Sequence, residues 1–210
     1  NTDAGFSIVS YTGTGSAGTI KHGLSTAPLI ILIKTASTTN WNFLTYQIDG
    51  SCDELALNLS SEGKTDRSIT APTSSVFSVD TAADRNGDGV NAIAYCFSER
   101  KGFSKFSTFK GNSSSDGTYI HLGFSPAFFL FKNSSSAGSW VLVDAKRPGF
   151  NVINDSLNTN NANAENTATV CDFTSNGVKF RTNADHMNGS YTFIYMAFAE
   201  NPFVTSTGVP

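Results

Sequence analysis

The sequence predicts an all-β protein, a β-sandwich built from two internally duplicated halves. Short aromatic and β-branched runs alternate with polar clusters along 210 residues that include 27 Ser, 23 Thr and 19 Asn beside 17 Phe. Such runs, bounded by turn-forming residues, are typical of strands. The same strings also recur in both halves of the chain, and no stretch has the periodicity of a long amphipathic helix.

The repeat has an offset of 97 to 101 residues. Its matched parts are Ala27–Lys34 with Ser125–Lys132, Trp41 with Trp140, and Ala94–Glu99 with Tyr195–Glu200. A period of about 100 residues is too long for a solenoid unit and suits a small sandwich. We therefore predict a first β repeat over 1–101, a second over 102–203 and an extended C-terminal tail over 204–210. Because almost no linker separates the repeats, we expect them to pack into one compact body.

The strands expected in the first half are 6–11, 29–35, 42–48, 54–59, 76–79 and 91–98. Those expected in the second half are 103–109, 128–132, 140–144, 170–173, 178–182 and 191–199. The apolar runs Leu29–Ile33 and Phe128–Phe131 do not alternate with polar residues, so these strands are predicted to be covered on both faces. The polar segments Lys34–Trp41 and Lys132–Trp140 predict hairpin loops.

Composition excludes several classes of function. With 15% charged residues, a net charge of −3 and no cluster of Lys and Arg, the chain does not suit nucleic acid or an anionic membrane. Every apolar run, Leu29–Ile33 among them, is far shorter than the roughly 20 residues of a spanning helix. Three cysteines allow at most one disulfide, so no disulfide network is expected.

Gly13–Gly18 spells G-x-G-x-x-G, the pattern of phosphate-binding loops. That chemistry needs a helix to begin at the loop, whereas Pro28 and a predicted strand follow here. The counterpart in the second half, Gly111–Gly117, has no middle glycine. We interpret the segment as a glycine-rich hairpin loop and expect no cofactor there.

Asp84, Asn86 and Asp88 place oxygen ligands at alternate positions before Gly89, as in the first half of a calcium loop. These three residues are the candidate metal ligands. The twelfth position from Asp84 is Tyr95, where a bidentate Glu is wanted. The alternative is a polar turn stabilised by local hydrogen bonds.

Trp41 and Trp140 are candidate stacking platforms for sugars, but their matched positions in the two halves favour a role in the core. Enzyme signatures such as G-x-S-x-G, H-E-x-x-H and a Walker loop are missing. We therefore expect a protein without catalytic residues.

The repeated strings resemble a known module. Gly123–Lys132, followed by Trp140 and Asp144–Arg147, is similar to a recurring module of bacteriophage virion and tail-fibre proteins. Tyr195–Phe203 resembles the closing strand of that module, and Ala94–Glu99 the matching end of its first half. The resemblance implies a jelly-roll or concanavalin A-like β-sandwich. That module has no established catalytic residues, so the resemblance assigns no functional site to this chain.

The resemblance implies a virion structural protein, an extracellular tail-fibre or appendage module for attachment to a host-surface glycan. The alternatives are a capsid decoration or fibre-base protein that binds other virion subunits, and a free carbohydrate-binding lectin. The expected partners are other virion proteins, a host glycan and further copies of this chain, with no nucleic acid and no membrane insertion. Loops 80–91 and 150–166 diverge between the halves, so we expect recognition there.

Overall fold

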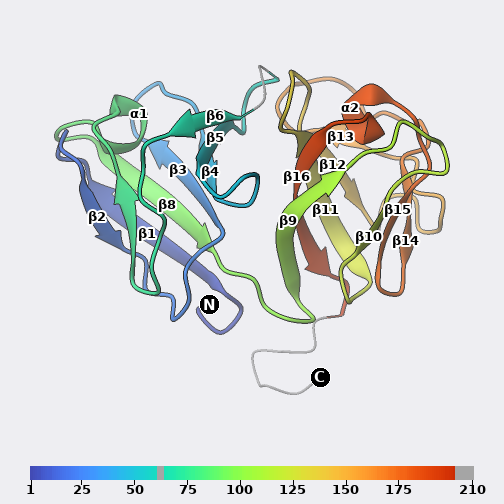
Figure 1. Cartoon of the computed structure of the whole chain (residues 1–210), viewed down its shortest axis with the longest axis horizontal. Helices are drawn as coiled ribbons and strands as arrows, with labels where there is room; N and C mark the ends of the chain where they lie inside the picture. Colours follow the sequence, from blue (N-terminus) through green and yellow to red (C-terminus); the bar gives the residue numbers. More distant parts are fainter. Residues whose placement is uncertain (61–63, 202–210) are drawn as a thin grey trace. The chain divides into compact units, whose positions relative to one another are not determined.

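The computed structural model describes residues 1–60 and 64–201, so the predicted tail 204–210 lies outside the described residues. Strands make up 42% of the structure and helices 4%, which confirms the all-β prediction. The described chain divides into two compact units (Figure 1): residues 1–58 with 64–99, and residues 100–201 with Leu59 and Ser60. Packing of the two halves into one body stays a prediction.

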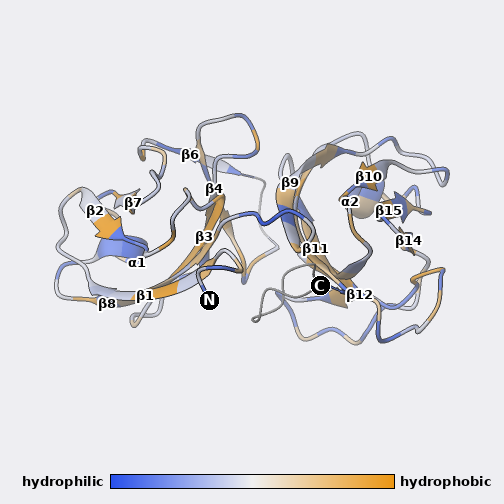
Figure 2. Cartoon of the chain, turned by 90° about the horizontal axis from the view of Figure 1, so that it is seen from below, coloured by the Kyte–Doolittle hydropathy of each residue, from blue (hydrophilic) through white to orange (hydrophobic). Residues whose placement is uncertain are grey.

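The first unit contains a six-stranded antiparallel sheet in the order β1-β8-β3-β4-β5-β6. Its strands are β1 (Phe6–Thr12), β8 (Asn91–Phe97), β3 (Ile30–Thr35), β4 (Asn42–Thr45), β5 (Cys52–Ala56) and β6 (Thr65–Arg67). A two-stranded sheet of β2 (Gly18–Lys21) and β7 (Val76–Val79) forms a second layer across from it (Figure 2). The core between these layers contains Ile31, Ile33 and Phe77.

The second unit contains a five-stranded antiparallel sheet in the order β13-β12-β11-β16-β9. Its strands are β9 (Ser104–Lys110), β16 (Thr192–Ala199), β11 (Pro126–Asn133), β12 (Val141–Asp144) and β13 (Leu157–Asn158). The smaller sheet consists of β10 (Tyr119–His121), β15 (Gly177–Phe180) and β14 (Cys171–Thr174). Phe109 fills the core between the layers, where its ring centroid lies 4.8 Å from that of Phe193 and 5.0 Å from that of Phe180.

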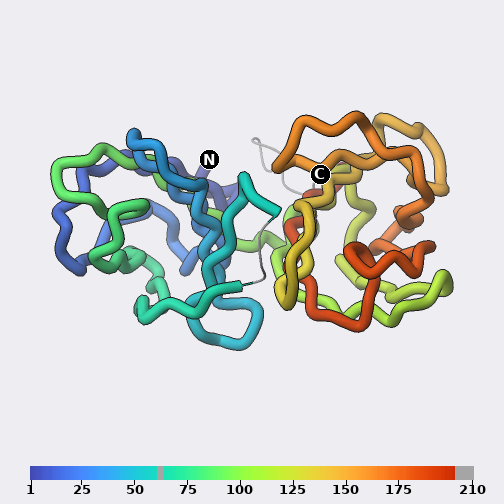
Figure 3. The backbone as a smooth tube through the Cα atoms, turned by 90° about the horizontal axis from the view of Figure 1, so that it is seen from above, coloured from blue at the N-terminus to red at the C-terminus, as the bar shows by residue number. Residues whose placement is uncertain are grey.

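The two units share one strand order, because β1-β8-β3-β4-β5 corresponds to β9-β16-β11-β12-β13. The backbone can be followed from blue to green through the first set and from green to red through the second (Figure 3). The register agrees as well: Lys34 lies opposite Ile93 in one sheet, and Lys132 lies opposite Ile194 in the other. This agreement supports the predicted duplication.

The described residues form two helices, α1 (Ala83–Asn86) and α2 (Asp185–Asn188), of four residues each. They occupy matching places, since α1 precedes β8 and α2 precedes β16. Neither helix is long and apolar enough to cross a membrane, and no other helix is found in the described ranges.

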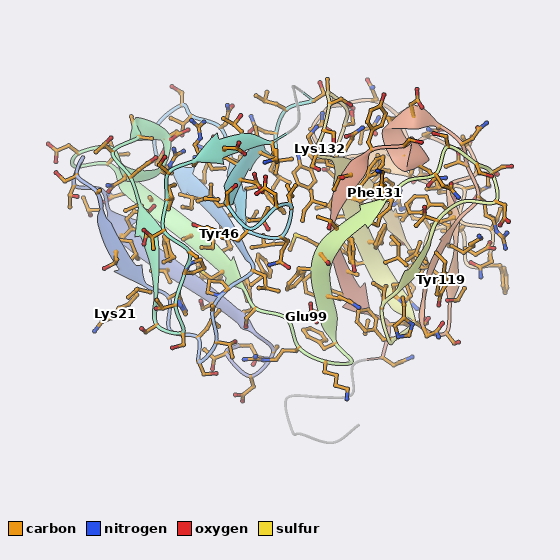
Figure 4. The ribbon with its side chains drawn as sticks, viewed as in Figure 1. Lys21, Tyr46, Glu99, Tyr119, Phe131 and Lys132 are labelled. Atoms are coloured by element: carbon orange, nitrogen blue, oxygen red, sulfur yellow. The ribbon has the colours of Figure 1, made fainter. Side chains whose placement is uncertain are left out.

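The apolar runs and their hairpins agree with the sequence analysis. β3 pairs with β4 and β11 pairs with β12, so the segments between them are hairpin loops. In β11 the successive residues Phe129, Leu130 and Phe131 are all buried, which shows that both faces of this strand are covered. Phe131 belongs to the core of its unit, and the neighbouring Lys132 is buried too (Figure 4).

The Gly13–Gly18 segment is not the hairpin loop that the sequence suggested, because β1 pairs with β8 whereas β2 pairs with β7. It carries the chain from one sheet to the other and passes against the end of α1. A Cβ atom on Gly13 would lie 2.2 Å from the carbonyl oxygen of Gly87, so only glycine fits. Gly111 has the same relation to Gly189, at 2.0 Å. The glycines therefore serve a close backbone approach.

The three cysteines, Cys52, Cys96 and Cys171, are free and buried. Burial raises the pKa of Cys96 to about 12 and raises that of Cys171 as well. Because the thiolate is the reactive form, we expect Ellman's reagent to label the native protein slowly and the urea-unfolded protein fast. A reductant should leave the melting temperature unchanged. Fast labelling of the native protein would contradict this assignment.

Candidate binding groove

A groove of about 630 Å³ lies on the outer face of the large sheet in the first unit. Its lining residues come from β1, β3, β8 and the loop before β4: Ser10, Tyr11, Thr12, Lys34, Thr35, Ala36, Trp41, Asn91, Ala92, Ile93 and Tyr95. Ile93 is a large apolar side chain in the floor and is 42% exposed. Exposed apolar surface of this kind, rimmed by polar groups, marks binding sites.

The alternation of side chains along β8 determines which of them form the floor of the groove. In β8 the side chains of Ala94 and Cys96 enter the core, so Ile93 and Tyr95 point to the opposite face. Antiparallel pairing sets Ser10 of β1 opposite Ile93, and Lys34 of β3 opposite Ile93 from the other side. One row of three side chains, polar at both ends and apolar in the middle, thus crosses the sheet.

Trp41 and Tyr95 form an aromatic wall. Their ring centroids lie 6.0 Å apart with an interplanar angle of 29°, a stacked arrangement. The backbone of Trp41 is fixed on both sides, since its N–H donates to Oδ1 of Asn58 at 2.8 Å and its carbonyl oxygen accepts from Leu57 at 2.9 Å. The backbone of Trp41 is therefore held in place, its ring stacks on Tyr95, and part of the indole surface stays open to the groove.

Polar groups surround this apolar surface. The Lys34 ammonium donates to the carbonyl oxygens of Thr35 at 2.7 Å and Ser37 at 2.8 Å, which holds it at the rim. The Thr12 hydroxyl donates to Oδ1 of Asn91 at 2.9 Å, and both side chains are exposed. An apolar surface with a few well-placed donors and acceptors is the usual makeup of a small-molecule site.

The matched tryptophan of the second unit has a different environment. The backbone N–H of Trp140 donates to Oδ1 of Asn160 at 2.8 Å, as the backbone N–H of Trp41 does to Oδ1 of Asn58. The Trp140 side chain, however, is fully buried. A core role therefore holds for Trp140, whereas Trp41 lines the groove. Identical residues at matched positions have separate roles in the two units.

A profile of a family described as a domain of unknown function, DUF7483, matches residues 1–202. The chain belongs to this family. No curated protein and no solved structure matches it. The DUF7483 match covers both units, and its description assigns no ligand.

The residues suggested as calcium ligands lie in and after α1 of the DUF7483 chain, and two of them have protein partners. Oδ1 of Asp84 accepts from Arg85 at 3.0 Å. The buried Asn86 amide accepts from the Thr14 N–H at 3.0 Å and donates to the carbonyl oxygens of Ser16 and Asp80. Asp88 is exposed. Calcium at these residues stays a prediction, but the structural role of Asn86 is plain.

Asn188 in α2 has the same role in the second unit. Its amide accepts from the Asn112 N–H at 3.3 Å and donates to the carbonyl oxygens of Ser114 and Thr182. Both asparagines thus tie a short helix to the segment that joins the two sheets. Sequence reasoning missed this pair, although both are followed by glycine at matched positions, Gly87 and Gly189.

Replacing Asn86 with alanine should therefore destabilise the fold, because the Thr14 N–H and the carbonyl oxygens of Ser16 and Asp80 would lose the buried amide that binds them. We expect a loss of about 1–3 kcal/mol in the free energy of unfolding, measured by urea titration. Asp88→Ala is the matched control and should change stability by less than about 0.5 kcal/mol, as exposed positions do. Equal effects of the two changes would contradict the structural role.

Arg85 of α1 is a buried charge in the core of the first unit. Its guanidinium donates to both carboxylate oxygens of Asp80 at 2.8 Å and to Glu54. Glu54 also accepts two hydrogen bonds from Arg67 at 3.0 Å. The sequence does not indicate the ion pair between Arg85 and Glu54, because Glu54 lies on β5, far along the chain from α1.

Proposed function

We propose that this chain is a structural module of a bacteriophage virion, a tail-fibre or appendage domain that attaches the particle to a host-surface glycan. The groove beside Trp41 is the observation that carries the glycan part of this proposal. The resemblance of Gly123–Lys132 and Tyr195–Phe203 to phage virion modules supports the particle part. Other virion proteins and further copies of the chain complete the proposed set of partners.

The groove chemistry suits a sugar. The C–H faces of a pyranose pack against aromatic rings, and the Trp41–Tyr95 pair offers such a surface. Sugar hydroxyls both donate and accept hydrogen bonds, and Thr12, Lys34 and Asn91 provide partners of both kinds at the rim. The groove is therefore amphipathic in the way that a saccharide is.

Binding fits the groove better than hydrolysis does. A glycosidase of the usual kind needs two carboxyl groups about 5–10 Å apart at the scissile bond. None of the residues that line this groove in the described chain is Asp, Glu or His. The proposed role is accordingly attachment without catalysis.

One observation favours the alternative of a capsid decoration or fibre-base protein. Ile8 lies opposite Tyr95 on the same face of the sheet and is 59% exposed. Ile8 and Ile93 together form an apolar surface that is larger than a sugar needs. An apolar surface of this kind suits a contact with another virion protein. A free lectin would use the same groove as the leading proposal.

A glycan array tests the proposal. The labelled chain is expected to bind a subset of bacterial surface glycans, and Trp41→Ala is expected to weaken that binding at least tenfold, which corresponds to about 1.4 kcal/mol. Tyr119→Ala, which removes an exposed aromatic ring of the second unit, is the matched control and should bind as the unchanged chain does. Binding unaffected by Trp41→Ala, or no binding at all, would overturn the glycan assignment.

A further inference from the structure

We propose that the first unit contains a divalent cation site formed by the carboxylates of Asp49, Asp53 and Asp66, with the chemistry that Ca²⁺ requires. The site is separate from the groove and from the Asp84–Asp88 segment. Its three ligands lie on β5, on β6 and in the connection between β4 and β5.

The three carboxylates converge on one point. Asp53 on β5 lies directly opposite Asp66 on β6, and Asp49 precedes β5 in the connection from β4. One oxygen of each carboxylate lies within 4.8 Å of the others. Calcium binds oxygen ligands at about 2.3–2.6 Å, so oxygens on a common ion lie up to about 5 Å apart. A single ion can therefore contact all three.

Asp53 supplies a second, independent observation. Its side chain is fully buried, and its Oδ2 has no hydrogen-bond partner among the described residues. A buried carboxylate oxygen without a partner is costly, because nothing replaces the water that it has lost. A calcium ion that both oxygens of Asp53 coordinate, as calcium-binding carboxylates often do, would give Oδ2 the partner that it lacks.

The charges at the site are unbalanced. The Lys64 ammonium contacts all three groups, at 2.8 Å from Asp53, at 2.5 Å from Asp66 and close to Asp49. One positive charge thus faces three negative charges, and two of these lie directly opposite each other across a strand pair, where like charges destabilise a sheet. Lys64 is partly exposed, so its flexible side chain can leave the centre when a stronger cation enters.

The ligand set selects a hard cation. Three carboxylates and no sulfur or imidazole favour Ca²⁺ or Mg²⁺ over Zn²⁺ and Cu²⁺. Calcium tolerates irregular geometry and fills its remaining positions with water, whereas magnesium demands a near-ideal octahedron. Ser51 fixes the Asp49 carboxylate, since its N–H donates at 2.9 Å and its hydroxyl at 2.6 Å to Oδ1. Such outer contacts orient ligands at metal sites.

Isothermal titration of the chelator-treated chain with calcium chloride tests the site. We expect one site with a dissociation constant of about 10⁻⁴–10⁻³ M, the range of extracellular calcium modules. Asp49→Asn and Asp66→Asn should weaken binding at least tenfold, and both should fold, because Asp49 is partly exposed and Asp66 is 72% exposed. Lys64→Met should tighten binding, because it removes the competing ammonium.

Asp116→Asn is the matched control. Asp116 is an exposed carboxylate that pairs with Lys179 in the second unit, so its replacement should leave calcium binding unchanged. Absence of binding in millimolar calcium, both in the unchanged chain and in Lys64→Met, would overturn the proposal. Loss of binding in Asp88→Asn, with Asp49→Asn unaffected, would overturn it too and assign calcium to the Asp84–Asp88 segment.

Discussion

Replacing Trp140 with alanine is expected to lower the free energy of unfolding by about 3–5 kcal/mol, the usual cost of truncating a fully buried tryptophan. The loss has two parts: the transfer free energy of the indole and the cavity that remains after partial relaxation. Trp41→Ala should cost less, because the Trp41 ring is partly exposed along the groove.

Circular dichroism during urea unfolding measures both variants on one scale. The chain contains 2 Trp, one in each unit, so each variant also retains a single fluorescent reporter for the other unit. Equal losses of stability in the two variants would show that both tryptophans are core residues, as their matched positions in the sequence suggested. The assignment of Trp41 to the groove would then be wrong.

Arg85→Ala is expected to destabilise the first unit by about 3–5 kcal/mol. Removing one partner of a buried ion pair leaves the remaining charge without compensation. Here Asp80 would lose both of its hydrogen bonds from the Arg85 guanidinium, and Glu54 would keep only Arg67. The corresponding third residue of α2 is Met187, which is also buried. The second unit thus fills this place with an apolar side chain, and the first unit fills it with a charge.

Arg67→Ala is the matched control for this prediction. Arg67 binds the same Glu54 but is 35% exposed, so its loss should cost within about 1 kcal/mol, as at other exposed pairs. Thermal melting of both variants at neutral pH makes the comparison. A loss in Arg85→Ala no larger than that in Arg67→Ala would contradict the structural role of the buried charge.

Sequence reasoning found the strands that are rich in apolar and aromatic residues and missed short strands that are mostly polar. Val76–Val79 was predicted with its observed bounds, because three of its four residues are apolar and polar residues flank it on both sides. The missed strands are short and mostly polar: Gly18–Lys21, Thr65–Arg67, Tyr119–His121 and Leu157–Asn158. Each is defined by pairing with a strand elsewhere in the chain, and a local window does not contain that partner.

The lack of pairing partners in a local window also explains which candidate sites could be recognised from the sequence. The Asp84–Gly89 pattern is visible in six consecutive residues, whereas the groove brings together Ser10, Lys34 and Ile93 from three separate strands. The carboxylates of Asp53 and Asp66 meet only because β5 pairs with β6. Alternation within each strand was predictable, but the register that brings these side chains together was not.

Locating this chain in an intact particle would decide whether it is a virion protein. Gold-labelled antibodies against residues 1–201, imaged by electron microscopy on purified phage, are expected to mark a tail fibre or another appendage, and the bound antibodies are expected to block attachment to host cells. Label spread over the capsid, without an effect on attachment, would favour the decoration protein instead. Absence of the chain from purified particles would contradict the proposed virion function.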